Sequence, residues 1–96
     1  MTMFVRFGMS TSAFILIKLN NFSNNLEKSN LYTIKDQLHS IEGVDSVYLV
    51  DSCNSPFNAI ARVSATSIEA IYSILIGGIL KSPDVQGTTT MIVISK

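Results

Sequence analysis

Residues 41–63 read IEGVDSVYLVDSCNSPFNAIARV and predict the centre of the fold. Gly43 marks the point where a helix gives way to a strand, because glycine readily adopts the left-handed conformation that follows a helix. A β-rich stretch then runs to Val50, a polar segment with a proline occupies residues 51–56, and a second β-rich stretch begins at Phe57. Two such stretches joined by a polar segment predict a β-hairpin with an elaborate connecting loop.

Two further strands are predicted at residues 13–19 (AFILIKL) and 86–95. The first is apolar on both of its alternating faces, and both faces of the second lack charge. A strand that is apolar on both sides must be covered on both sides. The helices of the same domain can cover one face, but a chain of 96 residues can hardly supply a second layer. We therefore expect another subunit to cover the other face.

Two helices are predicted between the strands. Apolar residues at positions 31, 34, 38 and 41 share one face of a helix over residues 29–41. The second helix is expected to begin at Thr66, because Thr66-Ser67-Ile68-Glu69 matches a capping box. Its expected buried stripe consists of Ile68, Ile71, Ile74 or Leu75, and Ile79.

The end of the second helix contains Gly77-Gly78, and Pro83 prevents the helix from continuing. Each glycine costs about 1 kcal/mol in a helix interior relative to alanine. The pair indicates either close packing against a neighbouring backbone or a fraying helix end, and the second interpretation is slightly favoured.

The order strand, helix, strand, strand, helix, strand predicts an α+β fold of the ferredoxin-like βαββαβ type. This sandwich has one four-stranded antiparallel sheet with two helices on one face. Residues 12–96 are expected to form this single domain. Residues 1–11 (MTMFVRFGMST) are expected to be either an extra edge strand, an arm onto a neighbour, or a disordered tail.

The composition argues against several classes of function. Seven basic residues balance seven acidic ones and are scattered along the chain, whereas nucleic-acid-binding domains usually show a basic patch. The charged fraction of 15% is below the roughly 25% typical of soluble domains, which favours a surface partly covered by a partner. No apolar run is long enough to cross a bilayer, and no signal peptide is recognised. The single cysteine, Cys53, fits a reducing compartment, so a cytoplasmic location is expected.

No catalytic set is recognised in the sequence. His39 is the only histidine and falls on the solvated side of the first helix, and Cys53 has no nearby base or positive charge. There is no Cys-x-x-Cys pair and no glycine-rich phosphate loop. We expect no enzymatic activity, no cofactor and no metal. A small dimeric ferredoxin-like enzyme, such as a monooxygenase, remains an alternative if His39 lies in an interface pocket.

Three segments in this order resemble the effector-binding domain of the Lrp/AsnC transcription regulators, also called the RAM domain. They are residues 43–50 (GVDSVYLV), 57–63 (FNAIARV) and 83–94 (PDVQGTTTMIVI), and the resemblance extends over residues 12–95. It implies a ferredoxin-like fold, dimers formed through the sheets, and further assembly into octamers. It also implies small effectors, usually amino acids, bound between subunits near the loop that joins strands two and three.

This sequence departs from the family pattern in two respects. Full-length regulators carry a helix-turn-helix before this domain, whereas residues 1–11 leave no room for one. We therefore expect a stand-alone module that does not bind DNA itself and that senses a metabolite or joins a full-length regulator of the same family. The family commonly has Gly-x-Tyr/Phe-Asp before strand three, whereas this chain has Ser55-Pro56-Phe57-Asn58 after a longer loop. Asn58 can still accept a hydrogen bond, although it carries no carboxylate.

The function predicted from the sequence is a non-enzymatic module for ligand sensing and oligomerisation that modulates transcription through assembly. Hydroxyls and amides can bind the charged groups of an amino acid, although serine, asparagine and threonine are also ordinary turn and strand residues. The predicted ligand-binding residues are Asn54, Ser55, Asn58, Thr88 and Thr90. A pure assembly module that has lost its effector is the second alternative.

Overall fold

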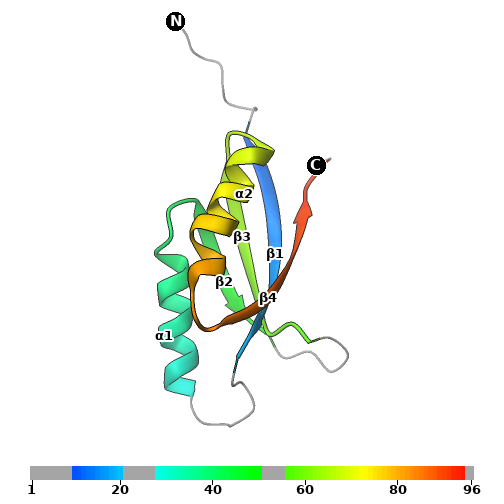
Figure 1. The fold of residues 1–96 in the computed structure, drawn as a ribbon. Coiled ribbons are helices and arrows are strands. Elements are labelled where there is room, and N and C mark those ends of the chain that lie inside the picture. Colours follow the sequence, from blue (N-terminus) through cyan, green and yellow to red (C-terminus); the bar gives the residue numbers. More distant parts are fainter. Residues whose placement is uncertain (1–9, 21–27, 51–55, 95–96) are drawn as a thin grey trace, which may run out of the picture.

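The computed structural model describes residues 10–20, 28–50 and 56–94. Its elements follow the predicted order along the chain (Figure 1). They are β1 (Thr11–Leu19), α1 (Lys28–His39), β2 (Val44–Leu49), β3 (Ala59–Ala65), α2 (Ile68–Gly77), the short 3-10 helix η3 (Ile79–Lys81) and β4 (Val85–Ile92). The observed boundaries differ from the predicted ones by one or two residues at most ends, which is the usual scatter of helix and strand termini.

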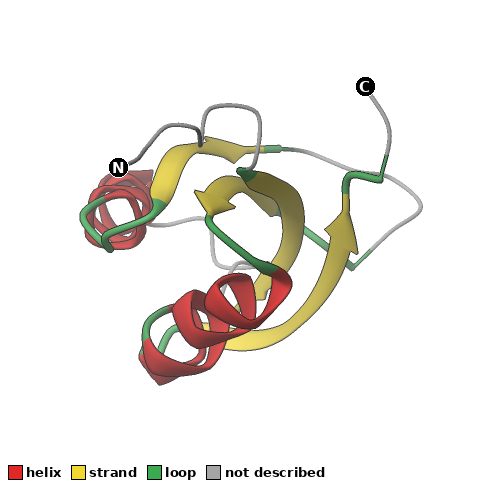
Figure 2. Cartoon of the chain, turned by 90° about the horizontal axis from the view of Figure 1, so that it is seen from above, coloured by secondary structure: helices red, strands yellow, loops and turns green. Residues whose placement is uncertain are grey.

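The four strands form one antiparallel sheet in the order β2-β3-β1-β4. This order confirms the ferredoxin-like prediction, because the first strand lies beside the third and the last. Both helices lie on the same side of the curved sheet (Figure 2). The two central strands, β1 and β3, pair from Thr11 with Ala65 to Ile17 with Ala59.

The core lies between the helices and one face of the sheet. Alternate residues of β1 point into it, so Ala13, Ile15 and Ile17 are fully buried, and the opposite residues of β3 join them. From the helical layer, Leu38, Ile71, Leu75 and Ile79 complete the buried cluster. The helix stripe predicted for the first helix is confirmed at Leu38, with residues 31, 34 and 41 packed around it.

Gly43 has two reasons to be a glycine. Its φ of +98° lies in the left-handed region that side chains other than glycine rarely adopt. A methyl group at this position would also collide with the side chain of Ile74 on α2. Position 43, in the turn after α1, therefore requires glycine, both for its backbone conformation and for the close approach of α2.

The start of α2 differs from the prediction. The N-cap is Ser67 rather than Thr66, and the Ser67 hydroxyl accepts a hydrogen bond from the backbone N–H of Ala70. Ile68, the first residue of α2, is 46% exposed and therefore does not belong to the buried stripe. Ile79 is buried as predicted, but it belongs to η3.

The two glycines at the end of α2 have different surroundings. Gly78 caps the helix, and a Cβ there would come within 2.8 Å of Ile41 Cγ2, so this glycine permits close packing against the turn that follows α1. A Cβ on Gly77 would meet no atom within 4 Å. Close packing thus explains Gly78, and the close neighbours are both the Ile41 side chain and the backbone carbonyl of Ile74.

Some of the predictions fall outside the described residues. They concern the tail at residues 1–9 and the loop at residues 51–55, which includes Cys53, Asn54 and Ser55. Among the helices that the structure describes, none is both long and apolar enough to cross a membrane.

Candidate ligand-binding and assembly site

The sheet face that points away from the helices is called here the open face. The strand register places residues from all four strands in two rows across it. One row is Tyr48, Ile60, Leu16 and Thr89, and the other is Ser46, Arg62, Phe14 and Met91. Residues directly opposite each other in neighbouring strands lie on the same face, so these side chains form one continuous surface.

The open face is mainly apolar, and among the described residues both helices lie on the other side of the sheet. Tyr48 is 57% exposed, and Phe14 and Met91 are also exposed. Leu16 and Ile60 lie between them at the centre and are half-buried. A contiguous apolar surface of this kind on a small domain marks an interaction site. The sequence-based expectation that β1 needs cover on both sides corresponds to this geometry.

Asn58 lies immediately before the third strand, β3, and is held from several directions. Its backbone N–H donates to the carbonyl of Ile17, and its carbonyl accepts from the N–H of Val50. Its side-chain Oδ1 accepts from the backbone N–H of Leu19 over 2.8 Å. The residue is only 8% exposed. Through this hydrogen bond, the Asn58 side chain holds the end of β1 beside the start of β3.

Thr88 and Thr90 lie on the helix side of the edge strand β4. Thr88 pairs with Ile17 and Thr90 with Ile15, and both of these isoleucines point into the core. The two threonines are half-buried, because the edge of the sheet extends beyond the fully enclosed centre. Thr89, between them, belongs to the open face and is exposed. The three threonines are therefore divided between opposite faces of the sheet.

Asn58 and Thr88 lie at the same end of the sheet but are not neighbours. Ala59, Ile17 and Thr88 form one line across β3, β1 and β4. Adjacent strands are about 4.8 Å apart, so β1 separates the two residues by roughly two strand spacings. A ligand that contacted both would have to reach across the end of β1, where the register with β4 shifts between Lys18 and Leu19.

His39 lies at the surface near a serine and an aspartate, but the geometry is not that of a catalytic triad. The Ser64 hydroxyl donates directly to the Asp45 carboxylate at 2.6 Å. His39 Nε2 is 3.1 Å from the backbone carbonyl of Asp45, not from a carboxylate or a serine. These two contacts tie the end of α1 to β2 and β3. Among the described residues, no group of three or more His, Cys, Asp or Glu side chains is arranged to hold a metal.

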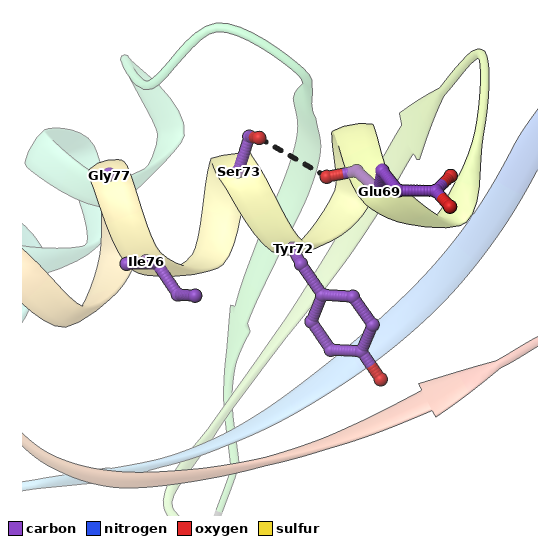
Figure 3. Close-up of a pocket in the computed structure, with 5 residues that line it drawn as sticks. All are labelled: Glu69, Tyr72, Ser73, Ile76 and Gly77. Carbon is purple, nitrogen blue, oxygen red and sulfur yellow. Dashed lines mark hydrogen bonds between the residues drawn. The ribbon is translucent and has the colours of Figure 1, made fainter.

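A shallow hollow lies on the outer side of α2 (Figure 3). It is lined by Glu69, Tyr72, Ser73, Ile76 and Gly77. The sequence analysis did not single out this surface. The signal that could have revealed it is the recurrence of large apolar residues every four positions, at 68, 72, 76 and 80.

Comparison with protein families assigns the chain to a class. The model of the Lrp/AsnC ligand binding domain matches residues 12–96. This chain therefore belongs to the family of Lrp/AsnC ligand-binding domains. No curated protein sequence matches the chain significantly.

Solved structures with the same fold include both short and long chains. TTHA0845 from Thermus thermophilus is similar with a TM-score of 0.71 and 21% identity, over 90% of this chain and 95% of that one. AsnC from E. coli is similar with a TM-score of 0.72 and 24% identity, over 93% of this chain and 54% of that one. This chain thus spans about half the length of E. coli AsnC.

A third similar structure is a transcriptional regulator from Neisseria meningitidis in complex with L-Met. Its TM-score is 0.71 at 14% identity, over 90% of this chain and 51% of that one. At these identities the likeness shows a shared fold, which agrees with the strand order described above.

Proposed function

We propose that this protein senses a small ligand, with an amino acid as the first candidate, and converts its binding into a change of assembly. The observation that carries the proposal is the open face. A member of the Lrp/AsnC ligand-binding domain family presents a mainly apolar sheet surface on which Tyr48, Phe14 and Met91 are exposed. Two copies can bury this surface by pairing sheet to sheet.

The ligand is proposed to bind at a subunit interface near the connection between β2 and β3. Asn54, Ser55, Thr88 and Thr90 are the proposed contacts. Asn58 is proposed to position this connection, because its Oδ1 already accepts the N–H of Leu19. Its side-chain NH2 group and the second lone pair of Oδ1 are the groups through which it would contact a ligand. The L-Met complex of the Neisseria regulator supports an amino acid as the class of ligand.

Binding at an interface would act through differential affinity. A ligand shifts an equilibrium only by the difference between its affinities for the two states. A site built from two subunits exists only in the assembled state, so ligand binding favours that assembly. We propose that the module modulates transcription through such a change of assembly. It acts through homo-oligomers or by joining a full-length regulator of the family, and not through catalysis.

The direct test combines thermal unfolding with sedimentation of the purified chain in the presence of each common amino acid. One or a few amino acids should raise the unfolding temperature and change the sedimentation coefficient. At one hundred times the dissociation constant, the stabilisation should be about 2.7 kcal/mol. For a domain of this size, that corresponds to a shift of roughly 10 °C or more.

Matched variants locate the site. Thr90→Val removes one hydroxyl with little change of volume and should weaken the response, whereas Thr66→Val, at an exposed threonine outside the sheet, should leave it unchanged. If no amino acid gives a response, the protein is a pure assembly module. If Thr90→Val and Thr88→Val both respond like the original chain, the ligand binds elsewhere.

A further inference from the structure

The open face carries three neighbouring polar side chains on its β2–β3 half. Ser46 in β2 lies directly opposite Arg62 in β3, and Tyr48 is the next residue of β2 on the same face. Residues on a diagonal between neighbouring strands are about 7–8 Å apart, which long side chains can bridge. The Tyr48 hydroxyl and the Arg62 guanidinium can therefore reach the same small group above the sheet. Ser46, Tyr48 and Arg62 are called here the polar cluster.

The polar cluster offers free hydrogen-bonding groups. Tyr48 and Arg62 are exposed, and Ser46 is half-buried. Within the described part of the chain, no group forms a hydrogen bond or an ion pair with the side chains of these three residues. A guanidinium presents five N–H donors in a planar fork that matches a carboxylate, and each hydroxyl adds one more donor. The cluster is therefore suited to binding an oxyanion.

No carboxylate among the described residues forms an ion pair with Arg62. Asp45, at the irregular position in the β2–β3 register, is the one acidic residue of these two strands. Its carboxylate instead accepts a hydrogen bond from the Ser64 hydroxyl at 2.6 Å. Lys18, which alternation places on the open side of β1, is a second cation. The described open face thus carries an excess of positive charge, although the chain as a whole has a net charge of zero.

Pairing of two open faces would bury the charge of Arg62. This residue lies in β3, one of the two central strands, so a second sheet would cover it. With the two-fold axis along the strands, between β1 and β3, Arg62 of each copy faces Phe14 of the other. With the axis across the strands, between the two rows, it faces Ile60. A charge that is buried without a partner is strongly unfavourable, and neither arrangement supplies a carboxylate.

We propose that the polar cluster binds the carboxylate of a small apolar acid, which becomes enclosed when two open faces pair. Arg62 would hold the carboxylate through two parallel hydrogen bonds, and the hydroxyls of Ser46 and Tyr48 would add further ones. The apolar part of the acid would lie on the β1 side, against Phe14 and Leu16. The inference rests on the sheet pairing of the proposed function, but this site is separate from the one near the β2–β3 connection.

The charges around the cluster favour an acid without an amino group. The ammonium of an amino acid would lie close to the guanidinium of Arg62, and two like charges at an interface repel each other. The carboxylate of Asp45 is directed to Ser64, so the cluster provides no free anion for an ammonium. A monocarboxylate with a hydrocarbon chain satisfies both the polar and the apolar half of the open face.

Sedimentation over a range of protein concentrations measures the dissociation constant of the dimer, with isovalerate as the probe. Isovalerate should lower this constant by roughly tenfold when it is present at ten times its own dissociation constant. Three matched compounds test the parts of the ligand. Acetate lacks the apolar part, isovaleramide lacks the charge, and valine adds an ammonium. Acetate and isovaleramide should have little effect at the same concentration.

Arg62→Gln removes the charge and keeps a hydrogen-bonding side chain. Without a ligand, this variant should dimerise more tightly than the original chain, because burying a neutral group costs less than burying an unpaired guanidinium. It should also lose the response to isovalerate. Tyr48→Phe keeps the ring and should weaken the response severalfold. Lys81→Gln removes an exposed cation of η3 and is the matched control, so it should respond like the original chain.

The outcomes separate this inference from the proposed function. If the chain dimerises but neither isovalerate nor Arg62→Gln changes the dissociation constant, the inference is wrong and the sheet pairing stands. If the chain is a monomer at every concentration, with and without isovalerate, the sheet pairing is wrong and the inference falls with it. A response to valine that persists in Arg62→Gln belongs to the other site. A valine response that disappears in this variant would mean that the two sites are one, which contradicts the inference.

Discussion

The side-chain Oδ1 of Asn58 accepts a hydrogen bond from the backbone N–H of Leu19 at 2.8 Å, across 39 positions of sequence. This bond lies just beyond the last pair of the β1–β3 ladder, Ile17 with Ala59. It ties the residue that follows the β2–β3 connection to the end of the central strand. The contact fixes the point at which the chain enters β3, next to the connection at which the ligand is proposed to bind.

Asn58→Ala should destabilise the fold by about 1–3 kcal/mol, because it leaves the N–H of the buried Leu19 without its acceptor. Chemical denaturation with and without the substitution measures this difference. Asn20→Ala is the matched control, because Asn20 also bonds through its side chain, to the carbonyl of Pro83, but in an exposed position. Equal losses for the two variants would contradict a special role for Asn58.

Gly43→Ala should cost about 1–3 kcal/mol, because alanine is strained at a φ of +98° and its methyl group would collide with Ile74. Ile74→Ala in the same chain should remove the collision but not the backbone strain at position 43. The losses of stability from Gly43→Ala and Ile74→Ala should therefore be less than additive. Gly87→Ala is the comparison, because nothing lies near a Cβ there. A loss at Gly87 as large as that at Gly43 would refute this explanation.

Ser67→Ala should lower the free energy of unfolding by about 0.5–2 kcal/mol, because the hydroxyl caps α2 by accepting the N–H of Ala70. Thr66→Ala at the preceding position should have a much smaller effect. Denaturation of both variants distinguishes the observed cap from the one that the sequence suggested. A larger loss of stability for Thr66→Ala than for Ser67→Ala would mean that Thr66 is the cap.

Tyr48→Lys should abolish pairing through the open face, because it places a charge where an apolar contact with the second sheet is expected. The variant should show a lower molar mass by light scattering and an unchanged far-ultraviolet circular dichroism spectrum. Tyr32→Lys makes the same chemical change at a site that is 59% exposed, against 57% for Tyr48. An equal change in mass for both would mean that the open face has no special part in assembly.

The sequence by itself determined the order of the elements and the class of the fold. Alternating apolar residues in β1 and the spacing of Leu38 with its neighbours are local patterns, set by the periods of strands and helices. Gly43 was recognised at the turn between α1 and β2 because its conformational freedom is also a local property. The expectation that a partner covers the second face of the sheet came from the same local patterns.

Only the tertiary structure decided which side chains meet. Ser67 rather than Thr66 caps α2, and Ile68, the first residue of this helix, lies at the surface and not in the core. Thr88 and Thr90 lie on the helix side of β4 because of their register with Ile17 and Ile15, which no local pattern fixes. Asn58 bonds Leu19 because the β1–β3 pairing brings the two residues together. Such contacts depend on strand register and helix docking, which are decided by the burial of the whole core and not by any one segment.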